Sequence, residues 1–122
     1  MESEAKVLCD HQTGYIPWLG LFHRASLCDI YVSLDTVKFN SRSYDSRNKI
    51  KTPHGFNWLN VPTKRSESEL LKDIRVNNTI GWREEHLKAI EHSYRGAEFF
   101  ACYFEKIRDI LGNKHEYLMD IN

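Results

Sequence analysis

The sequence predicts an α/β protein that starts with a β-α-β unit and a partly parallel sheet, followed by a β-hairpin and two C-terminal helices. Three patterns carry this prediction: strand, helix and strand signals in the first 35 residues, a turn signal between two strand-like runs, and two late segments with helical apolar spacing. With 122 residues, the chain is long enough for one domain with a modest core.

The first 35 residues have the pattern of a β-α-β unit. We expect a short buried strand at 6–10 (KVLCD), a helix at 17–27 and a second strand at 28–35 (CDIYVSLD). Pro17 suits the first position of a helix, and apolar residues recur at helical spacing from Trp18. A helical crossover of this kind places its two strands parallel, with a right-handed connection.

A β-hairpin is predicted at 48–61, after a polar segment at 40–51. Its turn is the tetrapeptide TPHG, in which Pro53 fixes one φ angle and Gly55 is free to adopt a positive one.

The rest of the chain predicts two helices. A charged, exposed segment at 66–73 and a short strand at 74–76 precede a helix from about Ile80, for which 77–79 (NNT) offers N-cap residues. The apolar face of that helix repeats every fourth residue: Trp82, His86, Ile90 and Tyr94. This stripe favours a partly buried structural role for its histidine. A second helix is expected at 97–111.

Composition excludes several classes of protein and of site. Lys plus Arg and Asp plus Glu both number 17, so the net charge is zero and we expect neither nucleic acid nor a membrane as a partner. The polar, acidic start MESEAK is unlike a secretory signal, and three cysteines without CxxC spacing fit a reducing cytoplasm. No His/Cys spacing indicates a metal site, and no Walker, GxSxG or GxGxxG motif is present.

The loop after the first strand is one candidate site. Ligands of open parallel sheets bind outside the carboxyl ends of the strands, and a helix N-terminus favours anions. His11, Gln12, Tyr15 and Asp35 would lie at that edge, and Gly14 would allow close approach. We interpret these four side chains as candidate catalytic residues. A loop whose polar groups only satisfy local backbone groups is the alternative.

The segment after the second strand is the other candidate site. Arg42, Tyr44, Arg47, Asn48 and Lys51 place three cations and two polar residues within ten positions. Arginine offers a planar fork for carboxylate or phosphate, so these residues are interpreted as substrate-binding. The alternative is a solvated basic loop.

Three segments resemble the WbqC-like family. HQTGYIPWLGLF (11–22) is similar to the family motif HQPxYLPWLGFF, and DIYVSLDTVKF (29–39) to D-x-F/Y-V-x-L-D-D-V-Q-F. RSYDSRNKIKTPHGFNWLNVP (42–62) is similar to RSWQNRN-I-K-T-PxGxxWLTVPV. Thr13 and Thr36 depart from the family's proline and second aspartate. The resemblance covers about residues 6 to 111, nearly the whole chain.

The resemblance implies a function in surface polysaccharide biosynthesis. Residues 1–122 would form a single WbqC-like domain, the N-terminal portion of a longer architecture. The family is associated with O-antigen and lipopolysaccharide sugars and with acyl or aminoacyl transfer to amino sugars, which implies a transferase or ligase. The substrate would be a small anionic sugar or a nucleotide-linked compound, with ATP as a candidate cofactor. The chain would pair with copies of itself or with a second subunit that supplies the missing part.

Two alternatives stay open. The strand, loop and helix layout is similar to nucleotidylyltransferases and ATP-dependent ligases of the HIGH type, although Tyr15 stands where a second histidine is expected. A non-catalytic binding or assembly subunit is the other alternative.

Overall fold

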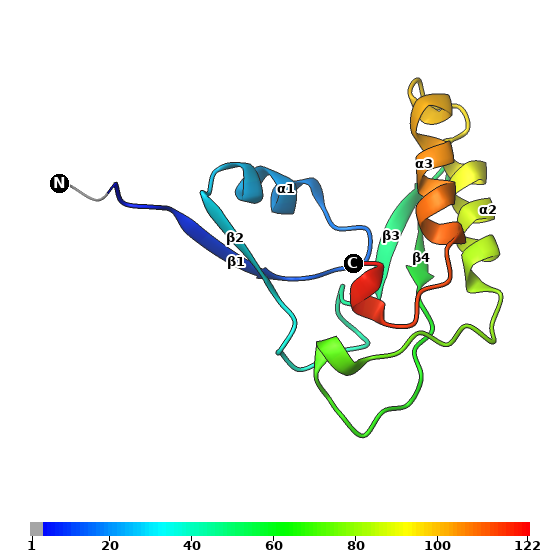
Figure 1. The fold of residues 1–122 in the computed structure, drawn as a ribbon. Coiled ribbons are helices and arrows are strands. Elements are labelled where there is room, and N and C mark those ends of the chain that lie inside the picture. Colours follow the sequence, from blue (N-terminus) through cyan, green and yellow to red (C-terminus); the bar gives the residue numbers. More distant parts are fainter. Residues whose placement is uncertain (1–3) are drawn as a thin grey trace.

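The computed structural model describes residues 4–122. A β-α-β unit lies to one side of the molecule, and a β-hairpin with two helices lies to the other (Figure 1). The elements are β1 (Leu8–Gln12), α1 (Leu19–Ser26), β2 (Ile30–Leu34), β3 (Arg47–Thr52), β4 (Gly55–Asn60), α2 (Trp82–Tyr94) and α3 (Phe100–Gly112). The predicted mixed α/β class is confirmed.

The β1-α1-β2 unit has the predicted parallel pairing. The register runs from Leu8 opposite Ile30 to Gln12 opposite Leu34. The prediction of a buried strand at 6–10 is wrong in two respects. The strand begins two residues later, and Cys9 is its only buried residue, because the sheet has just two strands and α1 covers it incompletely. No residue of α1 is buried either.

The predicted hairpin is confirmed. Strands β3 and β4 pair antiparallel from Arg47 opposite Asn60 to Thr52 opposite Gly55, with Pro53 and His54 between them. Gly55 has a φ of 138°, which explains why the turn needs glycine there. Ile50 and Leu59 are buried in the core.

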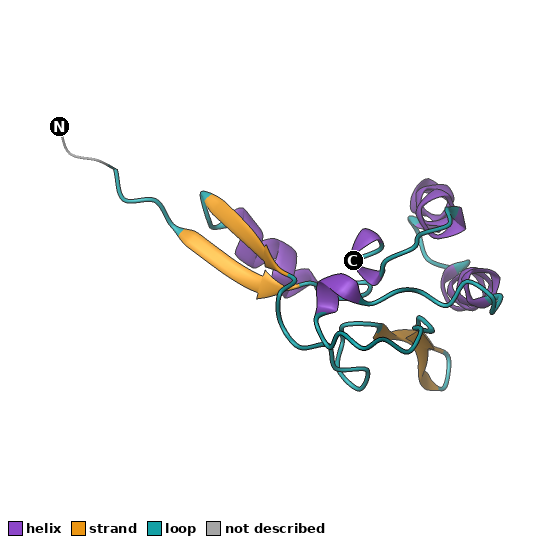
Figure 2. Cartoon of the chain, turned by 60° about the horizontal axis from the view of Figure 1, so that its bottom comes forward, coloured by secondary structure: helices purple, strands orange, loops and turns teal. Residues whose placement is uncertain are grey.

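The two helices pack on one side of the hairpin (Figure 2). The predicted stripe on α2 is confirmed, since Trp82, His86 and Ile90 are all buried. On α3 the buried residues are Phe104 and Leu111. Helix α2 starts two residues later than expected, and its N-cap is Gly81, which offers no side-chain cap.

The predicted caps of α2 serve other contacts. Asn78 donates to the carbonyl of His115 at 2.7 Å and accepts from Arg83 at 2.7 Å. Asn77 binds Thr79 instead of the helix.

The segment between the hairpin and α2 differs from its prediction. In place of a strand, Val76 and Arg75 form isolated bridges, Val76 with Thr63 and Arg75 with Tyr117. The two partners belong to different segments of the chain. The segment 66–73 is not wholly exposed, since Leu71 opens a 3₁₀ turn and is completely buried.

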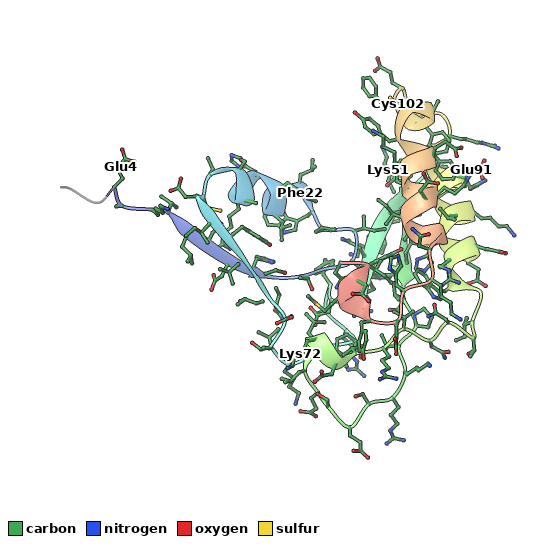
Figure 3. All side chains as sticks on the ribbon, in the orientation of Figure 1. Glu4, Phe22, Lys51, Lys72, Glu91 and Cys102 are labelled. Atoms are coloured by element: carbon green, nitrogen blue, oxygen red, sulfur yellow. The ribbon has the colours of Figure 1, made fainter. Side chains whose placement is uncertain are left out.

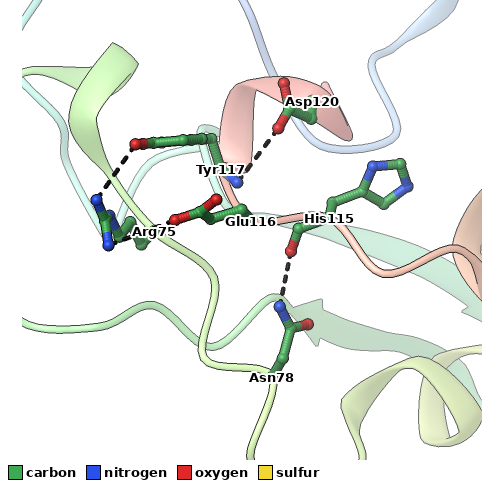
Figure 4. A network of polar contacts seen from close by, with 6 residues as sticks. All are labelled: Arg75, Asn78, His115, Glu116, Tyr117 and Asp120. Atoms are coloured by element: carbon green, nitrogen blue, oxygen red, sulfur yellow. Dashed lines mark hydrogen bonds and ion pairs between the residues drawn. The ribbon is translucent and has the colours of Figure 1, made fainter.

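The C-terminal segment, which has no sequence periodicity, is part of the core. Leu118 begins a 3₁₀ turn and has an exposed fraction of 0%. Figure 4 shows the polar contacts that hold this segment. Arg75 pairs with Glu116 at 3.4 Å and donates to the Tyr117 hydroxyl at 3.3 Å, while Asp120 accepts from the Tyr117 amide.

Within residues 4–122, no helix has both the length and the apolar character required to cross a membrane.

The burial of the tail predicts a large stability effect. Leu118→Ala should lower the free energy of unfolding by about 2–5 kcal/mol, because it leaves a cavity in the core. Leu19→Ala is the matched control, since Leu19 is 85% exposed and its loss should cost less than about 0.5 kcal/mol. Urea unfolding followed by circular dichroism measures both. Equal midpoints for the two variants would contradict the packing of the tail.

Candidate functional site

The loop after β1 is anchored in the core by Tyr15. Its side chain is only 1% exposed, and its hydroxyl lies 2.8 Å from Nδ1 of His86 on α2. Burial raises the pKa of the Tyr15 hydroxyl. Burial also lowers the pKa of His86 to about 4, against a smaller opposing effect of the Asn60 carbonyl. At neutral pH both groups are therefore uncharged, and the imidazole tautomer decides which of the two donates in this hydrogen bond.

The same loop is clamped to β3 by Asn48. The Nδ2 atom of Asn48 donates to the carbonyls of Tyr15 at 3.2 Å and Ile16 at 2.6 Å. The amide of Tyr15 in turn donates to the carbonyl of Tyr44 at 3.1 Å. A Cβ on Gly14 would lie 3.2 Å from that carbonyl, so the close approach favours glycine. The two sequence-predicted segments thus meet along this loop.

Ile16 carries backbone strain at the clamp. Its φ is 47°, in a region that β-branched residues rarely adopt. Such a conformation costs on the order of 1–3 kcal/mol and persists where the surroundings hold it. Asn48, bound to the Ile16 carbonyl, is one of the groups that hold it. Asn48 thus has a positioning role, which adds to its prediction as a substrate-binding residue.

The other predicted substrate-binding residues lie on or beside the outer face of the hairpin. This hairpin face carries Arg47, Lys49, Lys51, Phe56 and Trp58. Arg47 donates to the carbonyl of Arg42, and its guanidinium carbon lies 4.3 Å from the ring centre of Trp58. The ring of Tyr44 is 6.0 Å from that of Trp58. Lys51 is exposed, and its backbone amide donates to the Tyr94 hydroxyl at 2.9 Å.

Sequence reasoning missed three residues of this outer face: Lys49, Phe56 and Trp58. The register pairs Lys49 with Trp58 and Lys51 with Phe56. Directly paired residues share one face of a sheet, so the alternation in KIK and FNW was the available signal.

The remaining predicted residues lie at the carboxyl end of the parallel pair. His11 is opposite Ser33, and its Nδ1 lies 2.6 Å from the carbonyl of Gln12. Asp35 directly follows β2, and its backbone carbonyl accepts from the amide of Lys72. Within residues 4–122, no hydrogen bond or ion pair joins the side chains of His11, Gln12 or Asp35 to the hairpin face. Their catalytic roles stay predictions.

A cleft of about 700 Å³ separates the two parts of the molecule. Its lining is mainly apolar and comes from the Thr13–Pro17 loop, from α1 through Leu21 and Phe22, and from α3 through Phe100 and Tyr103. Figure 3 labels Phe22 on α1, across from α3. Of the predicted site residues, Tyr15 alone lines this cleft.

The part of the chain that the structure describes contains no group of three or more His, Cys, Asp and Glu side chains that could hold a metal ion. The cations and aromatic rings of the hairpin face and the polar groups of the β1 edge are candidate ligand-binding groups.

Together these features define an α/β protein in which a parallel β-α-β unit is clamped to a hairpin through one loop. The sequence pattern of the WbqC-like protein family matches residues 12–122, and the chain belongs to that family. It is 32% identical over 92 residues to "Uncharacterized protein Rv1507c" of Mycobacterium tuberculosis (strain ATCC 25618 / H37Rv), an alignment that covers 74% of this chain and 39% of the relative. The chain therefore spans about two fifths of that relative's length. No solved structure matches the present chain.

One departure from the family motif has a structural counterpart. Thr13, which replaces the usual proline, donates through its hydroxyl to the sulfur of Met119 at 3.0 Å and accepts from Asn122 at 3.4 Å. Thr36, the other departure, is exposed.

The clamp predicts a cost for removing Asn48. Asn48→Ala should lower the free energy of unfolding by about 1–3 kcal/mol, because it leaves two loop carbonyls without their donor. Asn57→Ala is the matched control on the neighbouring strand, where the side chain is exposed. Urea unfolding measures both, and equal midpoints would argue against the clamp.

The buried histidine predicts an acid-sensitive fold. The His86 pKa is lowered in the folded state, so the unfolded chain binds the extra proton, and stability falls as the pH drops from about 6.5 towards 4. The loss should reach on the order of 3 kcal/mol.

His86→Gln removes this titration and should flatten the dependence of unfolding free energy on pH over that interval. His92→Gln, an exposed position on the same helix, should leave the dependence as in the parent. Urea unfolding at several pH values is the measurement, and identical slopes for the parent and His86→Gln would refute the assignment.

Proposed function

We propose that the protein is a WbqC-like enzyme, or part of one, that acts as a transferase or ligase on a small anionic sugar or nucleotide-linked substrate. Its place would be the cytoplasmic synthesis of surface polysaccharide, such as the O-antigen of lipopolysaccharide. Acyl or aminoacyl transfer to an amino sugar is the reaction that the family resemblance favours.

The clamp between Asn48 and the loop carbonyls of Tyr15 and Ile16 is the observation that carries this proposal. The His11–Pro17 loop and the Arg42–Lys51 segment hold the most characteristic motifs of the family. Two side-chain hydrogen bonds join these segments and help to hold a strained residue in place. Such a connection supports a preorganised site over a chance loop contact.

Each predicted residue then has a role. His11 would act as general acid and base or as an oxyanion donor, because histidine generally changes protonation near neutral pH. Asp35 would orient His11 or a substrate hydroxyl, and Gln12 would bind the substrate beside them. Arg42, Arg47 and Lys51 would hold phosphate or carboxylate.

Nucleotide chemistry is a second candidate. The parallel β1–β2 pair, with α1 as its crossover, is the arrangement in which phosphate groups bind at the strand ends of α/β proteins. An ATP-dependent ligase or nucleotidylyltransferase-like activity would use this edge.

Assembly is a third candidate, favoured by the exposed apolar side chains of the β-α-β unit. They are Leu8, Leu19, Phe22, Leu27, Ile30, Tyr31 and Val32. Parallel sheets are normally covered on both faces, so this surface fits a second copy or a further subunit.

The decisive experiment pairs binding with turnover. Thermal unfolding of the purified chain is measured with ATP, nucleotide sugars, amino-sugar phosphates and acyl donors. In a separate assay the folded chain is incubated with the same compounds, and mass spectrometry detects new products. A ligand at a hundred times its dissociation constant should stabilise the fold by about 2.7 kcal/mol. His11→Ala should abolish product formation, whereas His23→Ala, an exposed histidine on α1, should not.

The outcomes separate the candidates. Loss of an ATP-dependent stabilisation in His11→Ala would favour the ligase or nucleotidylyltransferase alternative. Absence of any ligand effect, together with a stable complex in light-scattering mass measurements, would overturn the enzyme proposal in favour of an assembly subunit.

A further inference from the structure

We propose that the outer face of the β3–β4 hairpin binds a nucleoside diphosphate sugar, with its aromatic rings stacking on the base and the sugar and its cations holding the diphosphate. This inference rests on the proposed function and narrows its substrate to the nucleotide-linked class. It assigns binding to Lys49, Phe56 and Trp58.

The hairpin register builds this face from alternate residues. Arg47, Lys49 and Lys51 lie on one side of β3, opposite Asn60, Trp58 and Phe56 on β4. The intervening residues face the other way: Ile50 and Leu59 enter the core, and Asn48 binds the loop carbonyls. Three cations and two aromatic rings are thus presented together.

The aromatic rings form a continuous row. The ring centre of Trp58 lies 6.5 Å from that of Phe56 and 6.0 Å from that of Tyr44, which precedes the hairpin. The three aromatic residues remain partly accessible to solvent, since Tyr44 is 57%, Phe56 55% and Trp58 41% exposed. Exposed aromatic rings in a row offer stacking surfaces for flat or pyranose rings.

The cations are held over these rings. The Lys49 ammonium lies 4.1 Å from the ring centre of Phe56 and 4.9 Å from that of Trp58, and Arg47 covers Trp58 from 4.3 Å. Neither strand contains an Asp or Glu, and within residues 4–122 no carboxylate forms an ion pair with Arg47, Lys49 or Lys51. Their charge is therefore unbalanced on this face, which complements an anion.

The alternation of ring and charge selects the ligand. A nucleoside diphosphate sugar carries a base and a sugar ring at its two ends and two phosphates between them. The row offers Arg47 over the central Trp58 and Lys49 over Phe56 and Trp58 for the phosphates, with the rings of Tyr44 and Phe56 at its two ends for the base and the sugar. A free sugar phosphate would use the cations and leave rings unoccupied, and single-stranded nucleic acid would need a longer basic track than two six-residue strands in a chain of net charge zero provide.

Calorimetric titration of the purified chain tests this assignment. The probes are UDP-N-acetylglucosamine, GDP-mannose, glucosamine 6-phosphate and a ten-residue oligothymidylate. Both nucleotide sugars should bind, because stacking tolerates any base. Glucosamine 6-phosphate should bind at least about tenfold more weakly.

Two variants with matched controls locate the site. Trp58→Ala should weaken binding of the nucleotide sugars by about tenfold or more. Lys49→Gln should weaken it too and reduce its dependence on salt. Phe99→Ala and Lys106→Gln, an exposed aromatic residue and an exposed cation elsewhere, should leave it unchanged. Circular dichroism confirms that each variant is folded.

Three results would overturn the inference: nucleotide-sugar binding that survives Trp58→Ala, equal affinity for glucosamine 6-phosphate, or tighter binding of the oligothymidylate through the same residues. These three results carry no information on the turnover that depends on His11, so the proposed function would stand. Conversely, binding that requires Trp58 without any product formation would support the hairpin site and count against the enzyme.

Discussion

The attachment of one loop to two partners determines the arrangement of the whole molecule. Tyr15 inserts its ring into the core and bonds His86 on α2, while Asn48 on β3 holds the carbonyls of Tyr15 and Ile16. A buried hydroxyl and a buried imidazole are costly unless they are paired, so each fixes the position of the other. Through this loop the β-α-β unit is oriented relative to the hairpin and its helices.

Much of the fold follows from local sequence signals. The parallel crossover, the TPHG turn and the stripe of Trp82, His86 and Ile90 are all where their patterns indicate. Apart from shifted ends and the missing burial of β1, the errors lie in segments whose structure depends on distant partners. Leu71 and Leu118 each begin a three-residue 3₁₀ turn, and the two turns are in contact with each other and with the core. Three residues are too few to show a periodicity that would indicate this burial.

The candidate site was predictable as two segments and not as an arrangement. Sequence identified both Tyr15 and Asn48, but it could not show that Tyr15 is buried or that Asn48 turns away from the three cations beside it. The contribution of Lys49 and Trp58 depends on the hairpin register, which places them opposite each other. Register is decided by the turn, which the sequence indicates, and by the burial of Ile50 and Leu59, which only the folded hairpin shows.

The incomplete cover of the β-α-β unit also affects how the molecule moves. Its two-stranded sheet and the unburied helix α1 contribute little to the core, which is built mainly from the hairpin, the segment 61–76, α2, α3 and the C-terminal segment. Regions with few buried apolar contacts open more often than the rest of a protein. Amide hydrogens of β1 and β2 would accordingly exchange with solvent deuterium well before those of β3 and α2, and a bound molecule that bridges both parts would slow the first set selectively. Binding of a ligand or partner would thus act mainly on the opening of the β-α-β unit.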